Sequence, residues 1–233
     1  MKLRSLSAPL AIFVSLGIMS IPSGAASAPN AYAQMKAVFA DANAKQTFRY
    51  TLTATMTRRH LVNVTDATHL GGRQAITLTE AGKSNTVIVE LIAGNAYVKG
   101  DAAILVAYMG FPKSEATRLA NKWLEFPPSN PNFTVISTGI TIASTLDQVT
   151  MNKSVKSYPA VKLKGQLVDV LKGPSVPSGG NPSTAETLYF TTAGKPLPVE
   201  ATETYQGTTA TVTFSHWNET VVLATPKTVL EQK

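Results

Sequence analysis

The chain contains no cysteine among its 233 residues. It therefore forms no disulfide bond, offers no thiolate to a metal ion and has no cysteine nucleophile. It also has no cysteine that could carry a covalently attached lipid, so we expect any attachment to a membrane to be non-covalent. Beyond the N-terminal region, no apolar run reaches the length of about 18 to 20 residues that a membrane-spanning helix needs.

Motifs that would identify a catalytic centre are also missing. The sequence has no G-x-S-x-G elbow, no H-E-x-x-H pair and no G-x-G-x-x-G turn. The histidines are His60, His69 and His216, and we expect them at the surface. A cluster of His60, His69 and a carboxylate in one cleft would be needed to support an enzyme. We therefore expect a protein that is not an enzyme and that binds neither a metal ion nor a cofactor.

Charged residues are sparse, at 15% of the chain, with 21 basic and 14 acidic side chains and a net charge of +7. The basic residues are scattered and are not interleaved with aromatic residues, so we expect no nucleic-acid partner. A mild positive excess suits transient contact with an anionic membrane surface. The acidic side chains of Glu80, Glu90, Glu200 and Glu203 fall on predicted strand faces, where we expect them to be solvated or paired.

The N-terminal region has the three parts of an export signal. Lys2 and Arg4 give a positive start, residues 10–21 form an apolar run, and small residues follow up to Ala33. We expect residues 1–33 to be a signal peptide, cleaved near residue 26 or 33, and residues 34–233 to form one domain. Such a protein would be secreted or held in the cell envelope without a lipid anchor.

Alternation of apolar and polar residues predicts strands in the first and last thirds of the chain. In residues 45–59, Phe48, Tyr50 and Leu52 alternate with threonine, as in a strand with one face in water. Similar patterns occur in residues 73–82, 85–94, 160–171, 186–194, 197–205 and 209–217. Short glycine-containing turns between these segments favour an antiparallel meander.

The middle of the chain has helical patterns. Asp101 can cap a helix over residues 102–109 and Gly110 can end it. Further helices are predicted over residues 37–44, 113–122 and 137–149, whereas the proline-rich segment 123–133 is expected to be a loop. The order of strands, helices and strands predicts one α+β domain, in which helices cover one face of a large antiparallel sheet.

The predicted helix over residues 102–109 is apolar around most of its circumference. Packing between the sheet and the other helices would explain this pattern, and so would a cavity for an apolar ligand on one side. Methionine, leucine and tyrosine suit the wall of such a cavity. The residues predicted to line it are Leu52, Met56, Ile76, Leu78, Leu105, Tyr108, Met109, Ile142 and Leu146.

Four strings together carry a resemblance to a known family: NAYVKGDAAILVAYMG, ATRLANKWLEFP, TLDQV and LPVEATETYQGTTATVTFSHWNETVVLATP. They resemble the LolA-like superfamily, especially exported actinobacterial lipoproteins of the LppX and LprG type. The matching positions are Tyr97, Lys99, Gly100, Trp123, Pro127, Phe214, Ser215, Trp217, Asn218 and Pro226. The resemblance covers roughly residues 36–226 and has no catalytic content.

This resemblance implies a strongly curved antiparallel half-barrel sheet, with helices on its concave face and an apolar cavity that holds acyl chains. It also implies a lipid or acylated ligand, because members of the family carry lipids, glycolipids or lipoproteins across the cell envelope. The chain departs from the lipoprotein members in lacking the cysteine that is acylated. Two functions stay open: an exported lipid carrier, and a non-enzymatic envelope or surface-interaction protein of the same fold with a filled core.

Overall fold

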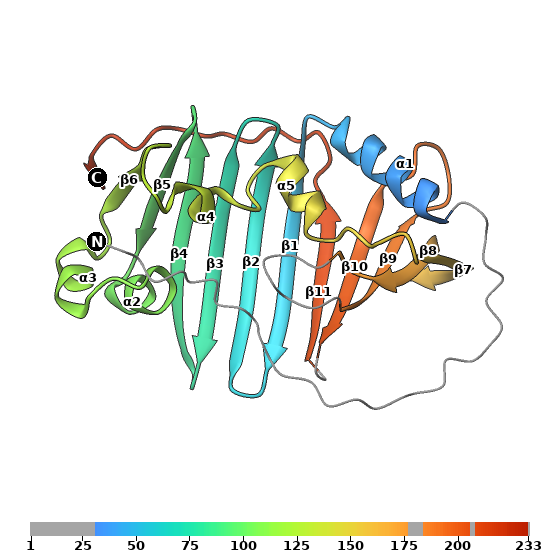
Figure 1. Cartoon of the computed structure of the whole chain (residues 1–233), viewed down its shortest axis with the longest axis horizontal. Coiled ribbons are helices and arrows are strands. Elements are labelled where there is room, and N and C mark those ends of the chain that lie inside the picture. Colours follow the sequence, from blue (N-terminus) through green and yellow to red (C-terminus); the bar gives the residue numbers. More distant parts are fainter. Residues whose placement is uncertain (1–30, 177–183, 206–207, 233) are drawn as a thin grey trace.

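The computed structural model describes residues 31–176, 184–205 and 208–232. Their strands form one 12-stranded sheet in the order β12-β6-β5-β4-β3-β2-β1-β11-β10-β9-β8-β7. The strands are β1 (Thr47–Met56), β2 (Arg59–Thr68), β3 (Gly72–Glu80), β4 (Lys83–Ile92), β5 (Asn95–Gly100), β6 (Trp123–Phe126), β7 (Lys156–Leu163), β8 (Gln166–Pro174), β9 (Ala185–Thr191), β10 (Pro198–Tyr205), β11 (Thr208–Ser215) and β12 (Val229–Glu231). The sheet is open, with β12 and β7 at its two edges (Figure 1).

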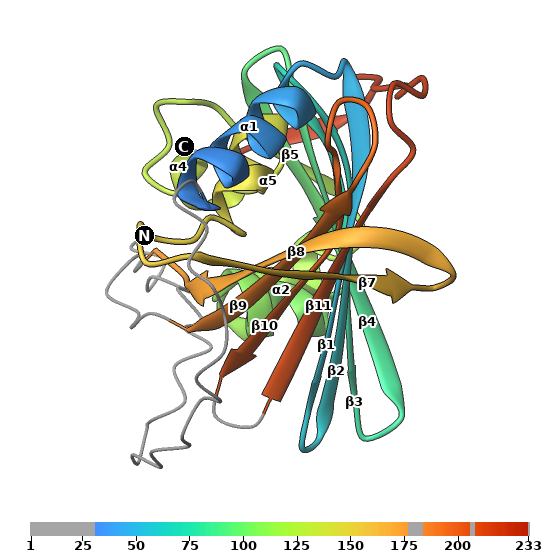
Figure 2. The same ribbon diagram turned by 90° about the vertical axis from the view of Figure 1, so that its right-hand side faces the viewer.

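The sheet consists of two antiparallel meanders that are joined through their end strands, β1 and β11. One meander runs from β1 to β5 and the other from β7 to β11, and β1 pairs with both β2 and β11. The parallel pair of β12 with β6 is the exception to the antiparallel pattern among the described strands. In Figure 2 the sheet curves so strongly that β7 and β8 run across the direction of β1 to β4.

The described helices lie on the concave side of this sheet (Figure 2). They are α1 (Ala31–Asn43), α2 (Ala102–Met109), α3 (Lys113–Leu119), α4 (Phe133–Ser137) and α5 (Ile142–Asp147). In Figure 1, α1, α4 and α5 cover the upper part of the sheet, whereas α2 and α3 lie at its lower left. This arrangement leaves the lower ends of β1, β2 and β3 without a described helix in front of them.

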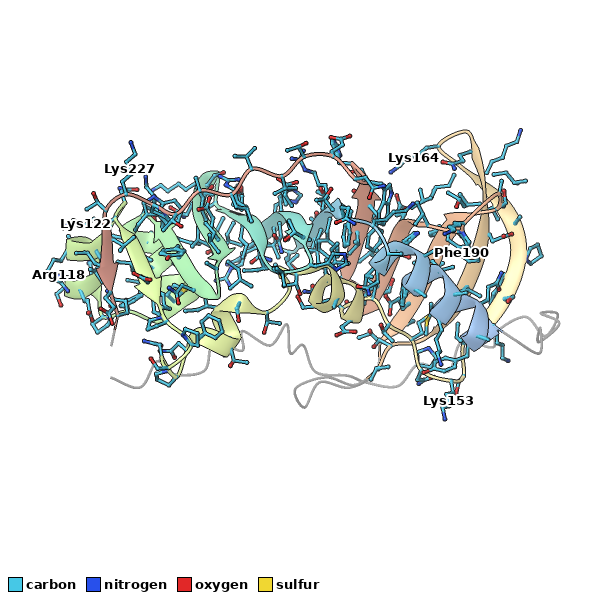
Figure 3. The ribbon with its side chains drawn as sticks, turned by 90° about the horizontal axis from the view of Figure 1, so that it is seen from above. Arg118, Lys122, Lys153, Lys164, Phe190 and Lys227 are labelled. Carbon is cyan, nitrogen blue, oxygen red and sulfur yellow. The ribbon has the colours of Figure 1, made fainter. Side chains whose placement is uncertain are left out.

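Buried apolar side chains form two separate clusters on the concave face. In the first, which we call the α1 core, α1 and α5 pack on β1 and on β8 to β11, with Met35, Val38 and Phe190 at most 2% exposed. Figure 3 shows Phe190 beside α1. In the second, the α2 core, α2, α3 and α4 pack on β3 to β6, and Leu119 and Leu124 are fully buried. Each helix layer therefore closes its own part of the sheet.

Local sequence chemistry accounts for α2. The carboxylate of Asp101 accepts a hydrogen bond from the backbone N–H of Ile104 at 2.9 Å, which satisfies a free donor of the first turn. Gly110 ends the helix with a φ of 68°, a left-handed conformation that glycine adopts without steric cost. Both ends of the predicted helix are confirmed.

Three predictions for other segments are wrong in detail. Residues 123–133 are not only a loop, because Trp123–Phe126 form β6 and α4 begins at Phe133. Residues 160–171 belong to two strands, because Lys164 and Gly165 both adopt positive φ and make a two-residue hairpin turn. The helix predicted over 137–149 is reduced to α5, which begins after a capping box formed by Thr141 and Ser144.

Candidate functional site

Most of the residues predicted to line an apolar cavity lie in one of the two cores. Ile76, Leu105 and Met109 are buried in the α2 core. Ile142 and Leu146 are buried in the α1 core. The side chain of Tyr108 lies outside the described part of the structure. Leu105 is 0% exposed, so the packing of α2 favours the ordinary explanation for its apolar surface.

A band of half-buried apolar side chains lies between the two cores, at the ends of the strands that the described helices leave uncovered. We call it the apolar strip and define it as Leu52 and Met56 of β1, Leu61 of β2 and Leu78 of β3. Leu52 packs against the α1 core, whereas Leu61 and Leu78 pack against the α2 core. The strip therefore connects two regions that are each closed on their own.

The register of the strands places the strip on the concave face. Side chains alternate between the two faces of a strand, and Leu52 shares its face with the buried Tyr50 and Phe48. Directly opposite partners then continue in one row from Glu186 and Glu203 through Ala210, Ala54 and Leu61 to Leu78. With strands about 4.8 Å apart, the row from Glu203 to Leu78 measures roughly 19 Å. The small side chains of Ala210 and Ala54 form its low middle part.

A polar row closes the strip on the side of the helices. The hydroxyl of Thr65, which is 0% exposed, donates to Oδ1 of Asn63 at 3.2 Å. The amide of Gln74 in turn donates to the Thr65 hydroxyl at 3.2 Å. Because the buried Thr65 and Gln74 and the half-buried Asn63 satisfy one another, they can lie between two apolar cores without a large desolvation cost.

A cavity of about 60 Å³ opens where the strip meets the α1 core. We call it the Glu186 cavity. Its lining residues are Tyr50, Leu52, Gln148, Val149, Glu186, Ala201, Glu203, Ala210 and Val212. Leu52 belongs both to this lining and to the strip. The hydroxyl of Tyr50 donates to Oε1 of Gln148 at 3.2 Å, so α5 and β1 meet across the cavity.

Two carboxyl groups from neighbouring strands face each other in this cavity. Glu186 of β9 and Glu203 of β10 are directly opposite partners. Glu186 is 4% exposed, and its Oε2 accepts no hydrogen bond within the described part of the chain. Burial, reinforced by the charge of Glu203, raises the pKa of Glu186 from 4.5 to about 8. Glu203 accepts a hydrogen bond from the hydroxyl of Thr184.

Sequence reasoning missed Glu186, Leu61 and the special position of Glu203. Glu80, Glu90 and Glu200 are paired with basic side chains, as expected for strand-face carboxylates. Glu203 departs from that expectation because its strand curves over the α1 core, where its side chain lines a cavity. Leu61 could have been found from the hairpin alone, since pairing of β2 with β1 places it opposite Ala54.

The opposite face of the sheet has a second cavity, of about 110 Å³. Arg49 and Arg73 lie in its wall, but Arg49 pairs with Asp66 at 2.6 Å and Arg73 with Glu90 at 3.3 Å. Both guanidinium groups are therefore already paired with carboxylates, so neither arginine is free to bind an anion in this cavity.

The histidines do not form a catalytic cluster. His60 and His69 lie at opposite ends of β2, about 30 Å apart for nine residues of extended chain. His60 contacts the hydroxyl of Thr55 at 3.1 Å. Within residues 31–176, 184–205 and 208–232, no group of three or more metal-ligating side chains is found. The same residues contain no helix that is long and apolar enough to cross a membrane.

Basic side chains lie at both ends of the molecule and form no single patch in Figure 3. Arg118, Lys122 and Lys227 are at the end that carries α3, whereas Lys153 and Lys164 are at the other end. Lys164 also pairs with Glu200 at 2.8 Å. Contact with an anionic membrane stays a prediction.

No family model matches the chain, and no curated protein sequence does. Several solved structures are similar to it, and LppX and LprF are two of them. The lipoprotein LppX of Mycobacterium tuberculosis superposes with a TM-score of 0.53 and 13% identity, covering 85% of this chain and 100% of LppX. LprF of Mycobacterium bovis superposes with a TM-score of 0.55 and 12% identity, covering 87% of this chain and 99% of LprF.

Identities this low establish a common fold and nothing finer. The fold class expected from the sequence is confirmed: the chain has the α+β fold of LppX and LprF, a large, mostly antiparallel, open sheet with helices on one face.

Proposed function

We propose that this protein is an exported carrier of a lipid or an acylated molecule, and that the acyl chain lies along the apolar strip. The observation that carries the proposal is the strip itself. Leu52, Met56, Leu61 and Leu78 are half buried on a concave face, between two cores that are otherwise closed. The family resemblance of the sequence, which implies acyl-chain binding, points the same way.

Burial of an acyl chain requires no reactive group. Each methylene removed from water contributes about 0.8 kcal/mol, so a dozen methylenes give roughly 10 kcal/mol before the entropy lost on binding is subtracted. The row from Glu203 to Leu78, which ends in the strip, measures roughly 19 Å at the usual strand spacing and is long enough to cover a chain of that size. Affinity is then set by the length of chain that the strip covers.

To enclose the chain, a helix must move over the strip, because no described helix covers it (Figure 1). The Glu186 cavity measures about 60 Å³, whereas cavities that enclose a drug-sized ligand measure roughly 300 to 1,000 Å³. The helices are the movable part, because the sheet is held by backbone hydrogen bonds along its whole width. Gly100 and Gly110 bracket α2 and are the positions where we place the hinge.

Export through cleavage of the N-terminal segment belongs to the same proposal. Residues 1–30 lie outside the described residues, and α1 begins at Ala31, which is 4% exposed in the α1 core. Cleavage near residue 26 keeps α1 whole, whereas cleavage after Ala33 removes part of its first turn. We therefore favour cleavage near residue 26. N-terminal sequencing of the secreted protein tests this choice, and a mature chain that begins at Gln34 would refute it.

The carrier function can be tested by lipid extraction and by binding. Protein purified from its own host should yield an acylated molecule on organic extraction, identified by mass spectrometry. After removal of that molecule, the protein should bind a fluorescent fatty acid, and Leu61→Asn should weaken binding about tenfold, equivalent to about 1.4 kcal/mol. Val222→Asn is the matched control, because Val222 is 81% exposed and lies outside the strip.

Thermal melting of both variants separates loss of binding from loss of fold. Unchanged affinity of a folded Leu61→Asn variant would exclude the strip as the binding surface. The alternative function, an envelope protein with a filled core, is favoured by the close packing of Leu105 and Met109. It would be supported by a folded protein that yields no acylated molecule and binds no fatty acid.

A further inference from the structure

We propose that the Glu186 cavity binds a protonated amine, which is the head group of the carried molecule, and that Glu186 and Glu203 are its anionic partners. This inference rests on the proposed function, because the chain attached to the amine occupies the apolar strip. It adds the chemical class of the head group and the residues that recognise it.

The two carboxyl groups are aligned with the strip. Glu186 and Glu203 are the first two members of the row that continues through Ala210, Ala54 and Leu61. A head group between the two carboxylates therefore directs its chain along the low floor made by the two alanines. Leu52 belongs both to the lining of the cavity and to the strip, so the two surfaces are continuous.

Glu186 carries an acceptor atom that no described residue uses. Glu186 is 4% exposed, and its Oε2 has no hydrogen-bond partner in the described part of the chain. Buried polar atoms are normally paired, and an unpaired one is costly. The titratable groups that face Glu186 are Glu203 from β10 and Tyr50 from β1. From the end of α5, the cavity receives only the neutral side-chain amide of Gln148. None of these supplies a positive charge.

The charge and the size of the cavity select the head group. The lining residues include two carboxyl groups and no lysine, arginine or histidine. An anionic head group would be repelled, and an alcohol would supply a hydrogen but no charge. A primary ammonium group supplies both. A water molecule needs only about 10 to 15 Å³ of such space, so a cavity of about 60 Å³ has room for an ammonium group but not for a bulky head.

Binding of the ammonium ion moves one proton. At pH 7 the carboxyl group of the unliganded Glu186 is protonated, because its pKa is raised to about 8 by burial and by Glu203. The arriving cation favours the ionised form of Glu186, so its proton leaves to solvent as the charge pair forms. Proton release on binding is therefore a signature of this site that apolar contacts do not produce.

The experiment is calorimetry of the delipidated protein with dodecylamine, dodecanol, dodecanoate and butylamine at pH 7, in two buffers with different ionisation enthalpies. We expect dodecylamine to bind at least tenfold more tightly than dodecanol, with release of close to one proton per amine. Glu186→Gln should lower the amine-to-alcohol ratio, because only Glu203 is left to pair with the amine, and should abolish proton release. Glu80→Gln, an exposed carboxyl on the same face paired with Arg59, should leave the ratio unchanged.

The outcomes separate the two proposals. Binding of dodecanol with no preference for the amine, or an unchanged ratio in a folded Glu186→Gln variant, overturns the amine site and leaves the carrier function standing. Binding of butylamine as tightly as dodecylamine supports the amine site and overturns the role of the strip. Absence of binding of every dodecyl compound overturns both.

Discussion

Glu186→Gln should stabilise the unliganded protein at alkaline pH, by an amount that grows as the pH rises. Burial raises the pKa of Glu186 from its ordinary value of 4.5 to about 8. Because the folded state binds this proton more tightly than the unfolded state, native stability is fullest below pH 4.5 and is lost as the pH rises towards 8. The glutamine side chain is always neutral, so it avoids this loss.

The size of the effect follows from the shift. Each pKa unit corresponds to about 1.4 kcal/mol, so the rise to about 8 costs about 5 kcal/mol once Glu186 is fully ionised. Between pH 5 and pH 9 we expect the difference in unfolding free energy between Glu186→Gln and the natural chain to change by about 4 kcal/mol. Domains are stable by only about 5 to 15 kcal/mol, so this change is easily measured.

Urea denaturation at pH 5, 7 and 9 is the assay. Both proteins should show similar transition slopes, so that the midpoint reports stability. Glu80→Gln is the control: Glu80 is exposed and pairs with Arg59 on the neighbouring strand, and this substitution should give the same difference at all three pH values. If the difference for Glu186→Gln is also independent of pH, Glu186 is ionised in the folded protein and the raised pKa is refuted.

Three further predictions concern packing and local structure. Leu105→Ala should lower the unfolding free energy by about 2 to 5 kcal/mol, because Leu105 is fully buried in the α2 core, whereas Leu52→Ala should cost less than half as much. Equal costs in urea denaturation would contradict the distinction between core and strip. Asp101→Ala should cost about 1 kcal/mol in thermal melting and Asp101→Asn much less, because asparagine also caps helices; equal losses would exclude capping. Gly139→Ala should destabilise the fold, because φ is +76° and the added carbon would lie 2.1 Å from the Gln148 amide; an unchanged melting temperature would contradict this.

The predicted parts of the fold are those that local chemistry specifies. The threonine alternation around Tyr50 defines β1, and Asp101 with Gly110 defines α2. The short strand β6 was not predicted, because its four residues have no pattern of their own and are held by pairing with β5 and β12. The hairpin at Lys164 was missed because lysine is an uncommon residue at a positive φ.

The candidate site was also predicted only in part, because local patterns do not specify which strands pair. Alternation alone places Leu52 and Met56 on one face of β1, but it does not tell which other strands share that face. Leu61 joins the strip through the β1–β2 hairpin, and Glu203 reaches it through β11, whose Ala210 pairs with Ala54. Glu203 and Ala54, which are far apart in the chain, are brought into one row only by the pairing of β11 with β1.

The sequence by itself determined that this is a cysteine-free, strand-rich α+β chain with a capped apolar helix, and its N-terminal pattern predicts an export signal. The tertiary structure decided that this helix belongs to a packed core, and that the open apolar surface lies on β1, β2 and β3 instead. It also decided that Glu186 is buried opposite Glu203. The physical reason is that burial and pKa depend on which strands pair and how the sheet curves, and these are properties of the whole chain.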